Sequence, residues 1–174
     1  MLVACAHETR DAAVIELLLQ TGMRLSELSQ VKLSDIDLPP TIISDEGSVG
    51  SVRILGKGRK HRTVTLNWKA CRSIKAYLEV RPKLAIPGLF VTKFGGALGS
   101  RGIQHLVKRY LDDAQILQAS VHTLRHTFAT HMVRKGTKLS VVQQALGHAF
   151  LDTTAIYVNL AREVMDSELQ ANAL

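Results

Sequence analysis

Four polar side chains in the C-terminal part of the chain have the types and spacing that phosphate chemistry needs. His122 and Arg125 lie three residues apart, and His148 is followed nine residues later by Tyr157. Positions three apart share one face of a helix, so His122 and Arg125 are expected to address one target together. A guanidinium beside two imidazoles suits a phosphate. Because a tyrosine can form covalent intermediates, the pattern predicts phosphoryl transfer on DNA with Tyr157 as the nucleophile.

The charge of the chain favours a polyanionic partner. Its 174 residues include 22 Lys and Arg against 15 Asp and Glu, a formal net charge of +7. Each phosphate contact made by a basic side chain releases condensed counterions, which favours nucleic-acid binding. The length is that of one domain, and 46% hydrophobic against 21% charged residues indicates a globular chain.

Cysteine usage and hydropathy exclude several other classes of protein. Cys5 and Cys71 have no CxxC spacing, so neither a disulfide framework nor a zinc site is predicted. No apolar run approaches the ~20 residues that cross a bilayer, and the N-terminus lacks the basic region of a signal peptide. We therefore expect a cytoplasmic, nucleoid-associated protein that makes no contact with a membrane.

The elements that must position the polar residues are mostly helices. Apolar periodicity and capping residues predict helices at 10–21, from about 26, and at 68–80, 100–111, 121–135, 139–146, 153–158 and 161–171. Short β signals at 41–44, 51–55 and 63–66 are separated by glycine-containing turns. The sequence therefore predicts an α+β fold, a mostly helical domain with one small three-stranded antiparallel sheet and a basic hairpin tip.

Four motifs stand in a fixed order along the chain: TGMRLSEL, GKGRKHR, HTLRHTFATH and ALGHAFLDTTAIY. In this order, from about Arg10 to Tyr157, they resemble the catalytic domain of the tyrosine recombinase (phage integrase) family, including its Xer-type recombinases. The resemblance implies a site-specific recombinase that cleaves and rejoins double-stranded DNA without a metal or ATP. It assigns as catalytic residues Arg24, Lys57, His122, Arg125, His148 and Tyr157.

Two arginines and the tyrosine account for the central step. Arg24 and Arg125 would bind the non-bridging oxygens and stabilise the charge of a pentavalent transition state. The resemblance implies that Tyr157 would attack phosphorus and give a 3′-phosphotyrosine with a free 5′-hydroxyl.

The remaining site residues would move protons or orient the others. A phenol with an ordinary pKa near ~10 needs help in losing its proton, for which His122 is the expected group. Lys57, at the hairpin tip, would protonate the leaving 5′-oxygen. His148 would donate a hydrogen bond to the phosphate, and Glu27 would orient Arg24 or a neighbouring histidine.

The hairpin tip is open to more than one interpretation. Lys60 competes with Lys57 for the role of proton donor, and a phosphate-contacting loop without a catalytic role is the alternative for the whole tip. The basic residues expected to contact DNA are Arg59, Lys60 and Arg62.

We expect no metal and no cofactor. His122 and His126 stand four apart, as zinc ligands can, but the residues between them are not those of a metalloprotease and Arg125 would repel a cation. Neither a phosphate-binding GxxxxGK[ST] motif nor an EF-hand loop occurs in the sequence.

We expect residues 1–174 to form a single catalytic domain with a core at about 1–160, lacking the N-terminal DNA-binding domain usual in the family. The segment 161–174 is predicted to be an amphipathic helix. The resemblance implies that this helix docks on a neighbouring protomer in a tetramer on DNA, with packing on its own domain as the alternative. Without DNA we expect a monomer. The alternative functions are a DNA-binding accessory protein and a nicking-closing activity like that of type IB topoisomerases.

Overall fold

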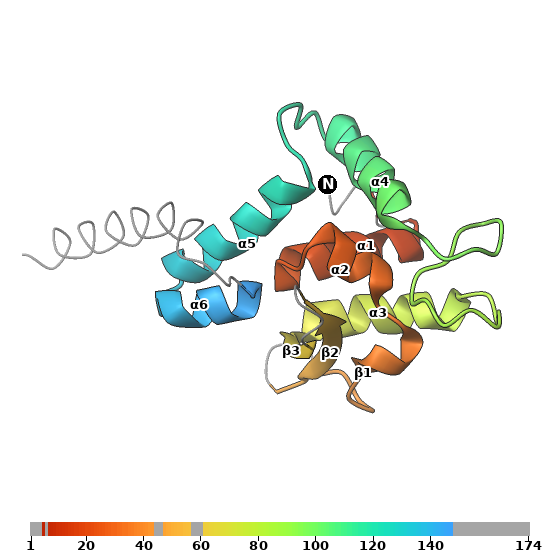
Figure 1. Cartoon of the computed structure of the whole chain (residues 1–174), viewed down its shortest axis with the longest axis horizontal. Helices are drawn as coiled ribbons and strands as arrows, with labels where there is room; N and C mark the ends of the chain where they lie inside the picture. The colour runs from red at the N-terminus through yellow and green to blue at the C-terminus, as the bar shows by residue number, and fades with distance from the viewer. Residues whose placement is uncertain (1–4, 6, 44–46, 57–60, 148–174) are drawn as a thin grey trace, which may run out of the picture.

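The fold is a helical domain that carries one small sheet (Figure 1). The computed structural model describes residues 5, 7–43, 47–56 and 61–147. Its elements in chain order are α1 Thr9–Thr21, α2 Leu25–Gln30, the 3₁₀ turn η1 Leu33–Asp35, β1 Ile36–Asp37, β2 Gly50–Leu55, β3 His61–Leu66, α3 Trp68–Val80, α4 Ser100–Asp113, α5 Val121–Arg134 and α6 Leu139–Leu146. The predicted fold class is confirmed. The helices predicted at 153–158 and 161–171 lie outside the described residues.

Helix α1 forms the centre of the main core. Its residues 13–18 are buried, and it packs against α3 and α5. Figure 1 shows α1 and α2 lying between α3 and the pair α4 and α5. The helix begins at Thr9, one residue earlier than the start predicted from the sequence, with Glu8 as its N-cap. It ends at Gly22, whose φ of +60° lets the chain turn sharply toward α2.

The sheet is antiparallel, with the order β1-β2-β3. The second and third strands lie where the sequence predicts them, with β3 starting two residues earlier. The first strand was predicted at 41–44, and this prediction is wrong for its described part, 41–43: the partner of β2 is Ile36–Asp37. Pro39 and Pro40 come one residue after β1, behind Leu38, and because proline has no N–H for a strand ladder, pairing ends before them.

The last two described helices form a separate small cluster. Buried apolar side chains of α5 and α6 pack on one another, apart from the main core: Ala129, Val133, Val142 and Leu146. This pair meets α1 at Gly22, where Phe128 and Leu146 lie against the glycine. The C-terminal end of α6 is thereby fixed beside the start of α2.

Substituting Gly22 with alanine should weaken this contact. A Cβ there would lie 2.4 Å from Phe128 Cδ1 and 2.8 Å from Leu146 Cδ2, at a backbone angle that alanine rarely adopts. We expect a loss of about 2–3 kcal/mol in the free energy of unfolding, measured by urea denaturation. Gly136→Ala is the matched control, since its φ is +77° but no atom lies within 4 Å. It should cost only about 1 kcal/mol, and equal losses for the two variants would show that the contact with α5 and α6 contributes nothing.

Candidate active site

The start of α2 carries the first arginine and its carboxylate partner. Glu27 Oε2 accepts a hydrogen bond from the Arg24 backbone N–H at 2.7 Å, and Glu27 Oε1 accepts one from Arg24 Nη1 at 3.1 Å. The Glu27 side chain is 4% exposed, whereas that of Arg24 is 38% exposed. The buried carboxylate therefore holds the backbone and one side of the guanidinium of Arg24 in place, while part of the guanidinium faces solvent.

Arg125 reaches the same place from α5. Its Nη1 donates to the Gly22 carbonyl at 2.7 Å, and its Nη2 donates to the Leu146 carbonyl at 2.8 Å. His122, one turn earlier on α5, is exposed and lines a hollow of about 490 Å³ together with Leu25, the residue after Arg24. Both predicted residues of α5 thus lie beside the junction of α1 and α2.

A third arginine enters from the sheet. Arg62 on β3 donates from Nη1 to Glu27 Oε1 at 2.7 Å and from Nη2 to Glu27 Oε2 at 3.1 Å. Its Nη2 also lies 3.4 Å from the Leu146 carbonyl. Glu27 is therefore shared between two arginines that come from different elements, α2 and β3.

The three guanidinium groups gather at the C-terminal end of α6. The Leu146 carbonyl accepts from Arg62 and Arg125, and the Gly147 carbonyl accepts from Arg24 Nη2 at 3.4 Å. The last carbonyls of a helix have no partner within the helix and lie at the negative end of its dipole, so they attract cations. Among the described residues, these three guanidinium groups and the carboxylate of Glu27 leave an excess of positive charge, which can hold an anion at the exposed face of Arg24.

The neighbouring arginines lower the pKa of Glu27. Burial acts to raise the pKa of the Glu27 carboxyl, but the hydrogen bonds from Arg62 and the Arg24 backbone, with both positive charges, outweigh burial. The pKa is lowered from its ordinary value of 4.5. Glu27 is accordingly a carboxylate at neutral pH and balances part of the arginine charge.

The other predicted site residues fall outside the described part of the chain: Lys57, Arg59, Lys60, His148 and Tyr157. His148 follows Gly147, the C-cap of α6, directly in the sequence. The two other tyrosines of the chain, Tyr77 and Tyr110, are 2% and 4% exposed. The Tyr77 hydroxyl accepts from the Val91 N–H, and the Tyr110 hydroxyl donates to Asp11. Neither buried tyrosine is placed to meet a DNA phosphate.

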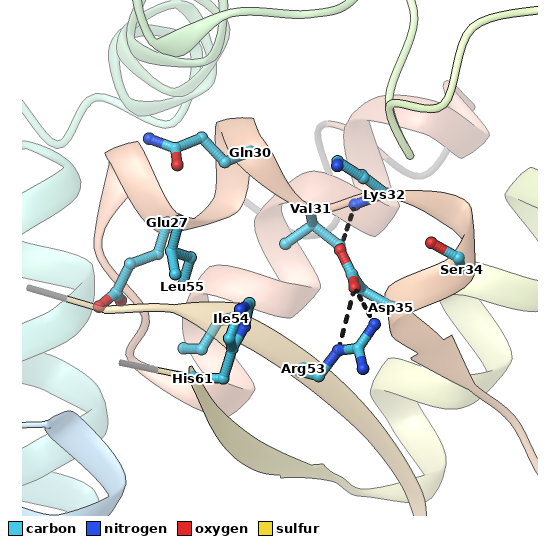
Figure 2. Close-up of a pocket in the computed structure, with 10 residues that line it drawn as sticks. All are labelled: Glu27, Gln30, Val31, Lys32, Ser34, Asp35, Arg53, Ile54, Leu55 and His61. Atoms are coloured by element: carbon cyan, nitrogen blue, oxygen red, sulfur yellow. Dashed lines mark hydrogen bonds and ion pairs between the residues drawn. The ribbon is translucent and has the colours of Figure 1, made fainter. Parts of the chain in front are cut away.

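A second ion pair lies beside Glu27 but belongs to a different network. Glu27 and the Arg53–Asp35 pair line one hollow of about 460 Å³ between α2, η1 and the sheet (Figure 2). Asp35 accepts from Arg53 Nε at 3.3 Å and from the Lys32 backbone N–H at 3.0 Å. Arg53 is 58% exposed, in contrast to the enclosed Arg62.

Sequence reasoning assigned Arg62 to DNA and missed its contact with Glu27. The sequence held a signal for this contact. Every second residue of a strand lies on the same face, so Arg62 shares the interior face of β3 with the buried Val64 and Leu66. His126, one residue after Arg125, is exposed. Across the described ranges no three histidine, cysteine, aspartate or glutamate side chains gather as a metal site. No described helix combines the length and apolar character that a membrane span requires.

Comparisons with known proteins place the chain in one family. The phage integrase family model matches residues 1–163. The tyrosine recombinase XerC of Halalkalibacterium halodurans is 38% identical over 166 residues, which cover 90% of this chain and 52% of that protein. The chain spans about half the length of the curated relatives that it matches.

Solved structures agree with the sequence match. The crystal structure of XerA recombinase superposes with a TM-score of 0.81 at 27% identity, covering 99% of this chain and 62% of that chain. The XerH site-specific recombinase bound to a palindromic difH substrate, in a post-cleavage complex, gives a TM-score of 0.74 at 31% identity, covering 92% of this chain and 45% of that chain. The chain therefore belongs to the phage integrase family.

Proposed function

We propose that this chain is the catalytic part of a site-specific DNA recombinase, which cleaves and rejoins double-stranded DNA through a 3′-phosphotyrosyl intermediate. The observation that carries the proposal is the convergence of Arg24 and Arg125 at the end of α6, immediately before His148. Two guanidinium groups from distant elements at one point form a binding site for a single phosphate. A cytoplasmic location, on the nucleoid, is part of the same proposal.

The chemical step conserves the bond energy of the DNA backbone. The Tyr157 oxygen forms a bond to phosphorus as the bond from phosphorus to the 5′-oxygen breaks. The phenolic proton passes to His122 or to water beside it, and the 5′-oxygen leaves as a hydroxyl after taking a proton from Lys57. The reverse attack by a 5′-hydroxyl of another strand restores the phosphodiester and frees the tyrosine, so the step needs no metal and no ATP.

The arginines stabilise the charge that develops during this step. Arg24 presents an exposed guanidinium face, while Glu27 holds its backbone N–H and Nη1. The carbonyls of Gly22 and Leu146 hold Arg125. Donors fixed before the reaction cost no reorganisation when the phosphate gains charge in its transition state. His148 adds a further hydrogen bond to the phosphate. Lys60 is the alternative proton donor to Lys57, and Arg59 and Lys60 are proposed to contact the DNA backbone.

Self-association on DNA belongs to the same proposal. An apolar hollow of about 570 Å³ lies between α1, β3, α5 and α6, lined among others by Leu19, Phe128, Met132 and Val141. Val141 is 47% exposed. The amphipathic segment 161–174 of a neighbouring protomer fits such a groove, because a helix buries its apolar face in an apolar cleft. We propose a tetramer assembled in this way on DNA, and a monomer without it.

The experiment that tests the proposed function is the capture of the covalent intermediate. A pool of nicked suicide duplexes with randomised arms is incubated with the protein, and adducts that survive denaturant are isolated. Trypsin should then release the peptide 139–162, whose only tyrosine is Tyr157, joined to the 3′-phosphate end of the cleaved strand. A protein that binds DNA but yields no adduct from any duplex would be an accessory DNA-binding protein and would overturn the proposal.

A further inference from the structure

Arg62 is turned toward the interior of the protein although it lies close to a basic hairpin tip. On β3 it shares a face with Val64 and Leu66, both buried, and it pairs across the sheet with Ile54, which is also buried. Its side chain is 19% exposed, against 58% for Arg53 on β2. Burying a guanidinium is costly unless its charge is paired and its N–H groups are bonded. The contacts of Arg62 must therefore offset the cost of burying its charge.

Those contacts join two elements of the site. The planar guanidinium meets both Glu27 oxygens, at 2.7 and 3.1 Å, which is the two-pronged geometry that arginine forms with carboxylates. A Cβ at Gly147 would lie 2.5 Å from Arg62 Nη1 and 2.7 Å from its Cζ. Glycine at position 147 therefore lets the guanidinium pack against the chain just before His148.

We propose that Arg62 is a positioning residue, which through Glu27 and the Leu146 carbonyl sets the relative placement of Arg24 and the end of α6. The proposal rests on the proposed function of the chain and deepens it. Glu27 holds Arg24 with the same two oxygens that Arg62 engages. Lys57 lies five residues before Arg62 in the sequence, and β3, the strand that holds Arg62, begins at His61.

The same contacts leave Arg62 little with which to bind DNA. Its Nη2 donates to Glu27 and to Leu146, and its Nη1 donates to Glu27. The Nε atom is buried and has no partner among the described residues. The charge of Arg62 faces a buried carboxylate, so a DNA phosphate would have to compete with Glu27 for it.

The test compares Arg62→Gln and Arg62→Lys with the unchanged chain on a duplex that the unchanged chain cleaves. Single-turnover cleavage is measured at saturating protein, and DNA affinity is measured separately as a function of salt. We expect cleavage to slow about 100-fold in both variants, because a misplaced Arg24 stabilises the transition state less well. Lysine cannot reproduce the two-pronged contact with Glu27. DNA affinity and its salt dependence should stay unchanged. Arg53→Gln is the matched control and should cleave normally, since its exposed pair with Asp35 belongs to a separate network.

A second comparison shows whether Arg62 acts through Glu27. Glu27→Gln combined with Arg62→Gln should cleave no more slowly than Glu27→Gln alone, because the two side chains form one unit. A substrate with a 5′-thiolate leaving group, which needs no proton, should restore cleavage by Lys57→Ala but not by Arg62→Gln. This result distinguishes a loss of the correct placement of Arg24 from a loss of the proton donor.

Three outcomes would overturn the proposal. The first is normal cleavage by Arg62→Gln. The second is a weaker affinity with a salt slope reduced by about 0.9 and full cleavage at saturation, which would make Arg62 a phosphate contact. The third is a Glu27 carboxyl signal that titrates identically in the free Arg62→Gln protein and the unchanged protein, as followed by NMR. Absence of an adduct with the unchanged chain would instead overturn the proposed function, and the NMR titration would still decide whether Arg62 engages Glu27.

Discussion

Tyr157→Phe is expected to abolish the covalent protein–DNA adduct and to leave DNA affinity unchanged. The substitution removes one oxygen atom and keeps the aromatic ring, so the phosphate still meets Arg24 and Arg125 but no nucleophile reaches phosphorus. The loss should be at least about 10⁴-fold, because removal of a nucleophile eliminates the covalent route entirely. The measurement is adduct yield on the nicked suicide duplex beside a binding isotherm for the same duplex.

The two buried tyrosines provide controls for this variant. Tyr77→Phe and Tyr110→Phe also remove one hydroxyl each, from the hydrogen bonds to Val91 and Asp11. Both should form the adduct at the rate of the unchanged chain and lose only modest stability, about 1 kcal/mol for each hydrogen bond. Full adduct yield from Tyr157→Phe, or its loss in a folded Tyr77→Phe protein, would contradict the assignment.

The described helices were predictable from the sequence because their signals are local. Asn67 caps α3 by accepting the Ala70 N–H at 3.0 Å, and the helix spans the residues that were predicted. Gly147, with a φ of +63°, ends α6 where the apolar periodicity stops. Caps and periodicity act within a few residues, so sequence alone locates them.

The first strand was not predictable in the same way. The segment at 41–44 has a β signal, but a strand forms only where a partner offers an unpaired edge. Ile36 and Asp37 lie opposite Val52 and Ser51, and this register depends on the turn at η1 rather than on β propensity. Two residues are too few to produce a recognisable alternation.

The residues of the site were predictable in part, but the contacts between them were not. Motif order indicated Arg24 and Arg125, whose guanidinium groups suit a phosphate, and Glu27 as the residue that orients Arg24 or a neighbouring histidine. The contacts between them join residues far apart in the sequence: Arg62 and Glu27 are 35 residues apart, and Arg125 and Gly22 are 103 apart. The packing of the sheet against α1 and α2 brings the first pair together, and the packing of α5 on α1 brings the second together. For this reason Arg62 was assigned to DNA although the alternation of β3 pointed it inward.

Glu27→Gln should cost about 4 kcal/mol in the free energy of unfolding at neutral pH. The carboxylate is the only acidic partner that the described residues give to Arg24 and Arg62. An amide keeps its shape but presents N–H donors and no charge, so two guanidinium groups remain close together without compensation. Removing one member of a buried ion pair is costly for this reason, at about 3–5 kcal/mol.

The pH dependence of stability gives this expectation a second measurement. The folded-state pKa of Glu27 lies below the ordinary value of 4.5, so its contribution is fully present above about pH 4.5 and is lost as the pH falls through the lower folded-state pKa. The difference in stability between the unchanged chain and Glu27→Gln should therefore shrink in acid and stay constant from about pH 5 upward. Asp35→Asn, which removes the partner of the exposed Arg53, should cost less than about 1 kcal/mol. A difference that does not shrink in acid would mean that the glutamine is destabilising by its shape, and that the charge of Glu27 does not hold the arginines together.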